Sequence, residues 1–380
     1  MIQKYIPYGK QQITSEDIAK VAQVLEEDWI TSGPKVTEFE EAVARYCQAT
    51  YGVAVTSGTA ALDIAIQTLA LPPGSEIITT PFTFIATVNS ILFNNCVPIL
   101  ADIEPDTYNI DPASIRKKIT KNTKAILYVN YAGQPCNIEE LQKIAREHHL
   151  FLVEDSAQAL GAEYNHTKIG SFADMTILSF HPVKHITTGE GGMVLTHNKA
   201  FNTRLRLLRN HGINKEVHER FGPKSGWAYD VLDLARNYRL TDFQSALGLS
   251  QLSRLDSFLK RREEIAEKYT AALQGHPKIQ IPRVRDNVKH SWHLYPILIK
   301  NYDRDVFFQK MRENNIGVNV HHIPAYEFTY HKRFGWKAED YPVTNQVFKS
   351  TVSLPMYPSM SDQQQEEVIK TIKSILHDPQ

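Results

Sequence analysis

Apolar segments alternate with amphipathic ones from residue 53 to residue 155, and this alternation limits the possible folds more than any other feature. The apolar segments, expected to be strands, are 53–55, 76–79, 97–100, 125–129 and 150–153. The amphipathic segments, expected to be helices, are 59–69, 82–94, 111–119 and 137–148. Apolar strands between amphipathic helices predict an α/β fold whose mostly parallel sheet is flanked by helices. Such sheets bind ligands at the carboxyl ends of their strands.

The remaining segments predict three parts of the chain. Residues 1–12 are expected to form an N-terminal arm, 13–250 a large domain, and 251–380 a linking helix with a smaller C-terminal α/β domain. Thr14 and Asp17 fit a capping box that opens a helix to about residue 27. Further helices are expected at 36–50, 241–273, 303–314 and 362–376, and strands at 173–180, 191–196, 292–299 and 317–320. Residues 214–233 lack periodicity and predict a mobile or interface loop.

The charge balance argues against some partners. The 380 residues hold 42 Lys and Arg against 42 Asp and Glu, so we expect no broad binding of nucleic acid or of an anionic membrane. No apolar run approaches the ~20 residues of a membrane helix, and the first residues lack an apolar signal region. These features predict a cytoplasmic protein. Cys47, Cys96 and Cys136 are widely spaced and are expected to be reduced thiols.

A polar turn follows the first strand of the alternation. Ser57, Gly58 and Thr59 come directly after this strand and open a helix. Free N–H groups at a helix N-terminus, hydroxyl groups and a glycine that permits close approach suit an anion, most naturally a phosphate. Simple helix capping by Ser and Thr is the common alternative.

Three other side chains follow strands of the same predicted sheet. Asp155, after strand 150–153, can pair with a protonated ring nitrogen or cap a helix, and Gln158 lies three residues further on. Phe84, after strand 76–79, can cover a planar ring or belong to the core. Lys184 lies on the loop between strands 173–180 and 191–196. Partial desolvation there would lower its pKa and suit a Schiff base, although a solvated loop lysine is the simpler alternative.

Together these features match what pyridoxal phosphate (PLP) requires. The phosphate needs N–H and hydroxyl groups, the pyridine nitrogen needs a carboxylate that keeps it protonated, and the aldehyde carbon needs an amine. Each feature alone is a weak indication. A phosphate turn, an aromatic ring, a carboxylate and a lysine in this order favour a PLP site.

Short motifs over nearly the whole chain also carry a family resemblance. They are WITSGP at 29–34, FE at 39–40, SGTAAL at 57–62, EDSAQ at 154–158, SFHPVK at 179–184, TGEGG at 188–192, NYRLTD at 237–242, WHLY at 292–295 and LPMYP at 354–358. With these motifs the chain resembles the DegT/StrS family of PLP-dependent sugar aminotransferases. The resemblance implies the PLP-dependent transferase fold type I, which is the fold of aspartate aminotransferase.

The resemblance implies a role for each cofactor-binding residue. Lys184 would hold PLP through a Schiff base, Asp155 would pair with the pyridine nitrogen, and Gln158 would lie near the phenolic oxygen. Asn237 of the partner subunit would reach the cofactor phosphate, which implies an obligate homodimer with shared active sites. The remaining contacts to the phosphate and the ring would come from Gly58, Thr59, Ser179 and Phe84.

The resemblance also implies a sugar-nucleotide pocket. Its lining would comprise Tyr8, Trp29, Ile30, Thr31, His293, Val320, His321 and His322. His321 and His322 are adjacent on an expected strand and should face opposite ways, so we expect no metal site. Lys184 argues against the dehydratase branch of the family, which carries histidine at that position. The sequence gives no explanation for His185, which stands where relatives often have Asn or Pro.

The implied activity is the transfer of an amino group from L-glutamate to a keto-sugar nucleotide. The resemblance favours a UDP-4-keto-6-deoxy-N-acetylhexosamine aminated at carbon 4, as in the pseudaminic acid route and in spore-coat polysaccharide relatives. A dTDP-linked sugar aminated at carbon 3 or 4 is one alternative, and a non-catalytic PLP-binding regulator is another. A cysteine desulfurase or aldolase of the same fold is a further competitor, although no cysteine lies in a predicted site loop.

Overall fold

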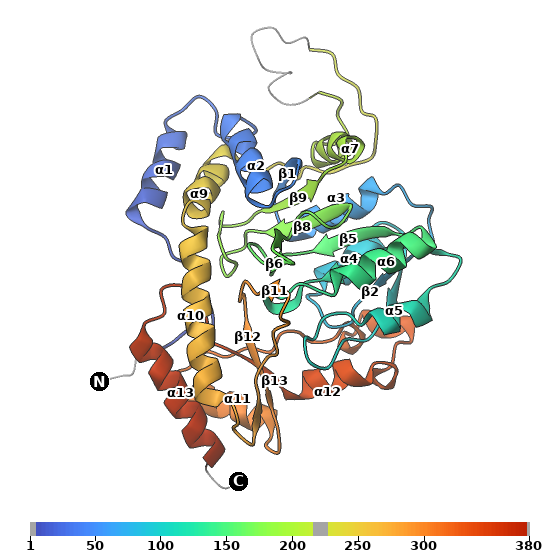
Figure 1. Ribbon diagram of the computed structural model, residues 1–380. Coiled ribbons are helices and arrows are strands. Elements are labelled where there is room, and N and C mark those ends of the chain that lie inside the picture. The colour runs from blue at the N-terminus through green and yellow to red at the C-terminus, as the bar shows by residue number, and fades with distance from the viewer. Residues whose placement is uncertain (1–4, 216–226, 378–380) are drawn as a thin grey trace.

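A seven-stranded sheet forms the centre of the computed structural model, which describes residues 5–215 and 227–377 (Figure 1). The strand order is β1-β9-β8-β5-β4-β2-β3. Only β9 runs antiparallel to its neighbours, and the other paired strands are parallel. This confirms the prediction of a mostly parallel sheet. The strands are β1 (Tyr51–Val55), β2 (Glu76–Thr79), β3 (Val97–Leu100), β4 (Thr123–Val129), β5 (Phe151–Asp155), β8 (Met175–Ser179) and β9 (Gly192–Thr196).

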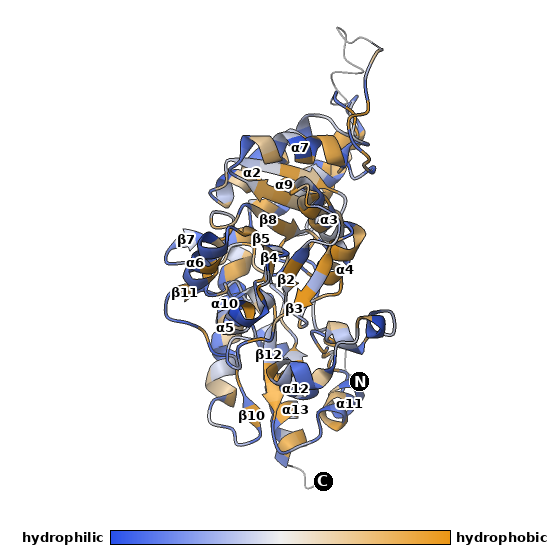
Figure 2. Cartoon of the chain, turned by 90° about the vertical axis from the view of Figure 1, so that its right-hand side faces the viewer, coloured by the Kyte–Doolittle hydropathy of each residue, from blue (hydrophilic) through white to orange (hydrophobic). Residues whose placement is uncertain are grey.

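Helices cover both faces of this sheet because alternate strand residues point to opposite sides. Ile77 and Leu127 belong to a core cluster with α3, α4 and α7. Ile78 and Ile126 belong to another core cluster, with α5 and α6. Figure 2 shows hydrophobic colour on β2 and β3. The helices are α3 (Gly58–Thr68), α4 (Ala86–Phe93), α5 (Pro112–Lys118), α6 (Ile138–His148) and α7 (Lys199–Arg209).

The N-terminal helices α1 (Ser15–Leu25) and α2 (Pro34–Tyr46) pack against α9 (Asp242–Leu252). The predicted capping box is confirmed, since the side chains of Thr14 and Asp17 each accept a backbone N–H of the other residue. The prediction of one helix over 241–273 is wrong. Ser253 and Arg254 separate α9 from α10 (Leu255–Leu273), and the Arg254 guanidinium turns toward Asp17, which it contacts through both carboxylate oxygens.

A three-stranded antiparallel sheet organises the C-terminal part. Its order is β10 (Ile279–Gln280), β12 (Tyr295–Ile299) and β13 (Thr351–Leu354). Around it lie α11 (Arg304–Glu313), α12 (Pro342–Ser350) and α13 (Asp362–His377). The expected strand 317–320 is wrong, because this segment forms an isolated bridge between Asn319 and Ser353 instead of a strand. β10, β13 and α12 were not predicted from the sequence.

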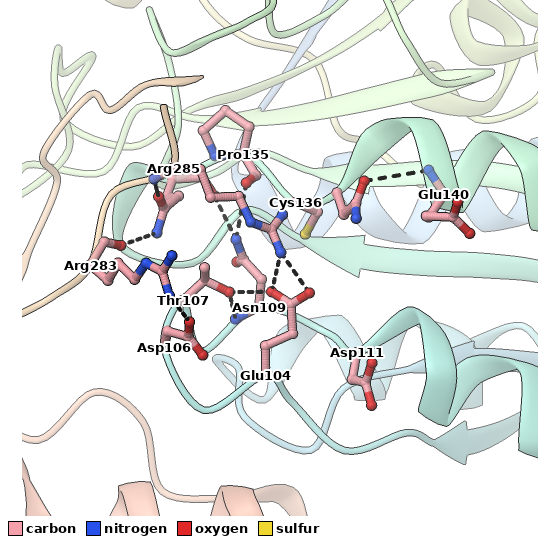
Figure 3. Close-up of polar contacts among 12 residues, drawn as sticks. Glu104, Asp106, Thr107, Asn109, Asp111, Pro135, Cys136, Glu140, Arg283 and Arg285 are labelled. Carbon is pink, nitrogen blue, oxygen red and sulfur yellow. Dashed lines mark hydrogen bonds and ion pairs between the residues drawn. The ribbon is translucent and has the colours of Figure 1, made fainter. Parts of the chain in front are cut away.

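Segments of the two predicted domains also touch directly. In a small third sheet, β11 (Val288–Lys289) pairs with β6 (Glu163–Tyr164), which in turn pairs with β7 (Thr167–Lys168). Arg285 donates to both carboxylate oxygens of Glu104 at 2.6 Å, and Arg283 donates to Asp106 at 2.7 Å (Figure 3). These contacts anchor the segment before β11 on the loop that follows β3. The division at residue 250 stays a prediction.

Two expectations from composition can be compared with the structure. Cys47, Cys96 and Cys136 are buried free thiols. Over the described ranges 5–215 and 227–377, no helix combines the length and the apolar character that a membrane crossing needs. Part of the loop predicted at 214–233, residues 216–226, lies outside the described residues.

Candidate active site

A cavity of about 770 Å³ lies where β1, β2, β4, β5 and β8 end. This is the edge of the sheet at which parallel strands present ligand-binding residues. The cavity brings together residues predicted from strands far apart in the sequence. Of the predicted site residues, those that line it are Tyr8, Gly58, Thr59, Phe84, Asp155, Gln158, Ser179, Lys184, His293, Val320, His321 and His322.

Four predicted residues do not line this cavity. Thr31 pairs with Thr241 in an isolated bridge, and the carbonyl of Ile30 accepts from Asp242 N at 3.1 Å. Trp29 is half-buried beside them. Asn237 is exposed and pairs with Asn210 in another bridge. Within one chain, the fold therefore does not bring these four residues to the lysine.

The turn after β1 holds the N-terminus of α3 at the cavity wall. The Ser57 side chain accepts from Ala60 N at 3.1 Å and so caps the helix. The N–H groups of Gly58 and Thr59 precede the first helical hydrogen bonds, as the first N–H groups of every helix do. A Cβ on Gly58 would lie 3.0 Å from Cβ of Ser179, so glycine lets this helix end approach the end of β8. The turn therefore caps the helix and also offers an anion site.

Asp155 is buried at the end of β5 and is held by two donors. Thr87 Oγ1 donates to Oδ2 at 2.8 Å, and Ala157 N donates to Oδ1 at 3.2 Å. Burial raises the pKa of Asp155, whereas the Thr87 hydroxyl, Ala157 N–H and the charge of Lys184 oppose this rise. Thr87 was not predicted as a site residue. The sequence signal that could have found it is a pair of threonines, Thr83 and Thr87, one helical turn apart in an apolar segment. In the structure their hydroxyl groups share a 2.8 Å hydrogen bond.

Lys184 lies on the loop between β8 and β9. Its backbone N–H donates to the His181 carbonyl at 2.9 Å, and Thr188 N donates to Phe180 O at 3.0 Å, which closes the loop. Burial lowers the pKa of the Lys184 amine to about 8, although the Asp155 carboxylate acts in the opposite direction. On the order of a tenth of such amines are neutral at pH 7, compared with less than about one in a thousand for an ordinary lysine. This supports the predicted nucleophilic amine.

The predicted orientation of the His321–His322 pair is wrong. We expected opposite faces of a strand, but both rings line the cavity with centroids 5.2 Å apart. The physical reason is that the segment has no strand geometry, so alternation does not apply. Over the described ranges, no three or more His, Cys, Asp or Glu side chains are grouped as a metal site.

The structure explains how His185 is accommodated. It is buried, and its Nε2 donates to the Ser291 carbonyl at 3.0 Å. Burial lowers the pKa of His185 well below its usual value. Its ring lies 5.6 Å from that of His293. His185 thus links the Lys184 loop to the segment that enters β12.

Known proteins match the chain over almost its whole length. The profile of the DegT/DnrJ/EryC1/StrS aminotransferase family matches residues 11–373. The chain is 39% identical over 385 residues to the spore coat polysaccharide biosynthesis protein SpsC of Bacillus subtilis, covering 99% of each chain. It is 36% identical over 377 residues to the UDP-4-amino-4,6-dideoxy-N-acetyl-beta-L-altrosamine transaminase of Campylobacter jejuni, covering 98% of this chain and 97% of that one.

Solved structures agree with the fold. The Streptococcus pneumoniae protein Spr1654 in its PMP form has a TM-score of 0.93 at 31% identity, covering 97% of this chain and 98% of that one. Its PLP form has a TM-score of 0.92. A helix N-terminus, a buried carboxylate and a half-buried, desolvated amine in one cavity fit the same cofactor in this chain. The fold and the site define a PLP-dependent sugar aminotransferase of fold type I. The chain belongs to the DegT/DnrJ/EryC1/StrS aminotransferase family.

Proposed function

We propose that this aminotransferase moves the amino group of L-glutamate to carbon 4 of a UDP-linked 4-keto-6-deoxy-N-acetylhexosamine. The observation that carries the proposal is the cavity in which Lys184 and Asp155 meet the N-terminus of α3. The choice of sugar is supported by the likeness to the Campylobacter jejuni altrosamine transaminase. A cytoplasmic location is part of the same proposal.

In this proposal five contacts hold PLP. Lys184 would bind the aldehyde carbon, Asp155 would pair with the pyridine nitrogen, and Gln158 would bind the phenolic oxygen. Phe84, which is 61% exposed in the single chain, would cover the ring. The N–H groups of Gly58 and Thr59 at the α3 N-terminus, with nearby hydroxyls such as that of Ser179, would bind the phosphate.

PLP supplies an electron sink for the carbanion that forms when a substrate proton leaves. The neutral amine of Lys184 would act as the general base that accepts and returns the substrate proton. Asp155 would keep the pyridine nitrogen protonated, because a buried carboxylate favours the charged form of a nearby cation. The low pKa of Lys184 suits this base role near neutral pH.

The sugar nucleotide would occupy the part of the cavity between the N-terminal arm and the C-terminal sheet. Tyr8, His293, Val320, His321 and His322 line it there. We propose that Trp29, Ile30 and Thr31 complete the pocket and that Asn237 of the partner subunit binds the phosphate. Their positions outside the cavity of one chain fit a homodimer with shared sites.

The test is spectroscopic and then chemical. The purified protein with PLP should be yellow and should lose the colour when L-glutamate is added, with 2-oxoglutarate released in equal amount. Yellow protein that glutamate leaves unchanged would favour a regulator or another amino donor. Incubation of the glutamate-treated protein with UDP- and dTDP-linked 4-keto sugars, followed by NMR of the product, should show nitrogen on carbon 4 of the UDP sugar. Nitrogen on a dTDP sugar alone would overturn the substrate choice.

A further inference from the structure

The amide of Gln158 has only one orientation that satisfies its neighbours. Its Oε1 accepts the backbone N–H of Ala132 at 2.7 Å, so this atom is the oxygen. Its Nε2 lies 2.9 Å from Nε2 of His322. An amide nitrogen only donates. His322 Nε2 must therefore accept, which means that it carries no hydrogen and that the imidazole is neutral with its proton on Nδ1.

The same reasoning shows which ring nitrogen of His321 carries the proton. Asn319 Oδ1 accepts Val320 N at 2.9 Å, so Asn319 Nδ2 donates to His321 Nε2 at 3.2 Å. His321 then donates through Nδ1 to Ser353 Oγ at 2.9 Å. In addition, the Tyr131 hydroxyl donates to the His321 carbonyl at 2.7 Å. The turn that carries His322 is therefore anchored on β13 and on the segment after β4.

Burial favours the neutral forms of the His321 and His322 imidazoles. It lowers the pKa of His321 to about 3 and that of His322 well below its usual value, and the positive charge of Lys184 acts in the same direction. Both rings are therefore uncharged near neutral pH. If His322 were protonated, its Nε2 would carry a hydrogen and would face the Gln158 amide nitrogen as a second donor.

We propose that His322 is a positioning residue for Gln158. Its neutral imidazole accepts a hydrogen bond from one of the two N–H groups of the Gln158 amide, and the backbone N–H of Ala132 donates to the amide oxygen. The second N–H group of the amide therefore has a fixed direction. Gln158 and Lys184 line the same cavity, and the second N–H is then available to the phenolic oxygen of PLP. This inference rests on the proposed function, because it needs PLP at Lys184 with its phenolic oxygen at Gln158.

The proposal predicts how side chains at position 322 change the bound cofactor. His322→Phe keeps an aromatic ring but has no acceptor, so the Gln158 amide can rotate and the phenolic oxygen loses a fixed donor. The phenolic oxygen then keeps more negative charge beside the imine proton, so this proton is held more tightly. The pH midpoint of the absorbance change of the bound cofactor should rise by about half a unit or more. The dissociation constant of PLP should rise on the order of five-fold.

Three further variants make the test specific. His322→Gln places an amide oxygen near the position of Nε2 and should restore both values. The side chain in His322→Asn is too short to reach Gln158, so this variant should show the same two changes as His322→Phe. It provides the test if His322→Phe folds poorly. In a Gln158→Leu background, His322→Phe should add little, because both substitutions remove the same contact. The exposed His148 gives the matched control His148→Phe, which should leave both values unchanged.

Two outcomes would overturn the positioning role. One is an unchanged midpoint in both His322→Phe and His322→Asn, and the other is an effect of His322→Phe that adds fully to that of Gln158→Leu. Borohydride reduction of the same samples separates this failure from failure of the proposed function. Label on Lys184 with an unchanged midpoint rejects the role of His322 alone, whereas absence of label on Lys184 rejects the PLP site itself.

Discussion

At the scale of single residues, the site places a carboxylate and an amine in surroundings that shift their pKa values in opposite directions. Burial raises the pKa of Asp155 and lowers that of Lys184, and the attraction between the two charges moderates both shifts. Such shifts are typical of functional sites. The buried donors around Asp155 therefore matter for activity, and Thr87 provides the most direct of them.

Thr87→Val should move the acid limit of activity upward. The Thr87 hydroxyl lowers the pKa of Asp155, so its removal raises that pKa, and the carboxylate is then lost at a higher pH as the solution is acidified. We expect the acid limb of kcat/KM to shift by about half a unit or more. Thr68→Val, which removes a buried hydroxyl bonded to Ile64 O at the far end of α3, is the control. Identical acid limbs in wild type and Thr87→Val would contradict the prediction.

The Lys184 amine should titrate near pH 8 in the protein without cofactor. Burial disfavours the charged ammonium, so the neutral, reactive form accumulates above about pH 8 rather than above the ~10.4 of an exposed lysine. The rate of trinitrophenylation of the Lys184 peptide, followed by mass spectrometry against pH, measures this midpoint. Exposed lysines such as Lys124 provide the internal comparison. A Lys184 midpoint equal to theirs would show that the loop does not desolvate the amine.

At the scale of secondary-structure elements, local signals predicted most starts and ends. Thr14 caps α1 as predicted, and Asn137 and Thr241 cap α6 and α9 at the starts of the helices expected at 137–148 and 241–273. The expected helix 82–94 begins only at Ala86, because Phe82 N bonds the Thr80 side chain and the chain forms a site loop first. The expected helix 36–50, by contrast, begins earlier than predicted, at Pro34, and ends at Tyr46.

The failures at this scale share a physical cause. The helical pattern over 241–273 continues through a two-residue break that depends on Arg254 reaching Asp17, more than two hundred residues away in sequence. β13 is short, and Pro355 follows it, so its sequence resembles a loop. It is a strand because β12 pairs with it. Tertiary contacts of this kind leave no local signal.

Gly192→Ala should weaken both the fold and cofactor binding. A Cβ on Gly192 would lie 2.4 Å from Ser57 O and 2.7 Å from Gly58 N, and these backbone atoms can move only if the α3 N-terminus moves. We expect a loss of about 1–3 kcal/mol in the free energy of unfolding, measured by urea titration, and weaker binding of PLP.

Gly9→Ala is the matched control for this test. Its Cβ would meet Val183 at an ordinary 3.7 Å. Equal stability and equal PLP affinity in Gly192→Ala and Gly9→Ala would mean that close packing of β9 does not position the phosphate turn.

At the scale of the whole molecule, the cavity is lined by residues of several helices, strands and loops, and it depends on the tertiary contacts between them. The carboxyl edge of the sheet was predictable, because parallel strands present their ends together, and Asp155, Lys184 and Gly58 were found in this way. The donors to Asp155 and the orientation of His322 were not, since Thr87 and the turn at Asn319 reach the site only through tertiary packing.

The proposed homodimer with shared sites can be tested by mixing two inactive variants. Lys184→Ala and Asn237→Ala should each be nearly inactive as homodimers. When the two are mixed and allowed to exchange subunits, each mixed dimer has one site with both native residues, so about a quarter of wild-type activity should return. Trp227 and Leu234, which are 93% and 88% exposed in the single chain, support a subunit contact near Asn237. Absence of recovery despite proven exchange would place Asn237 outside the site of the partner subunit.

The attachment of PLP to Lys184 is the claim on which the mechanism rests. Borohydride reduction of the purified protein fixes the cofactor to whichever amine holds it, and peptide mapping by mass spectrometry then locates that amine. We predict a stoichiometric pyridoxyl label on Lys184, and none in Lys184→Ala. A label on any other lysine, or no label on protein saturated with PLP, would contradict a Schiff base at this position.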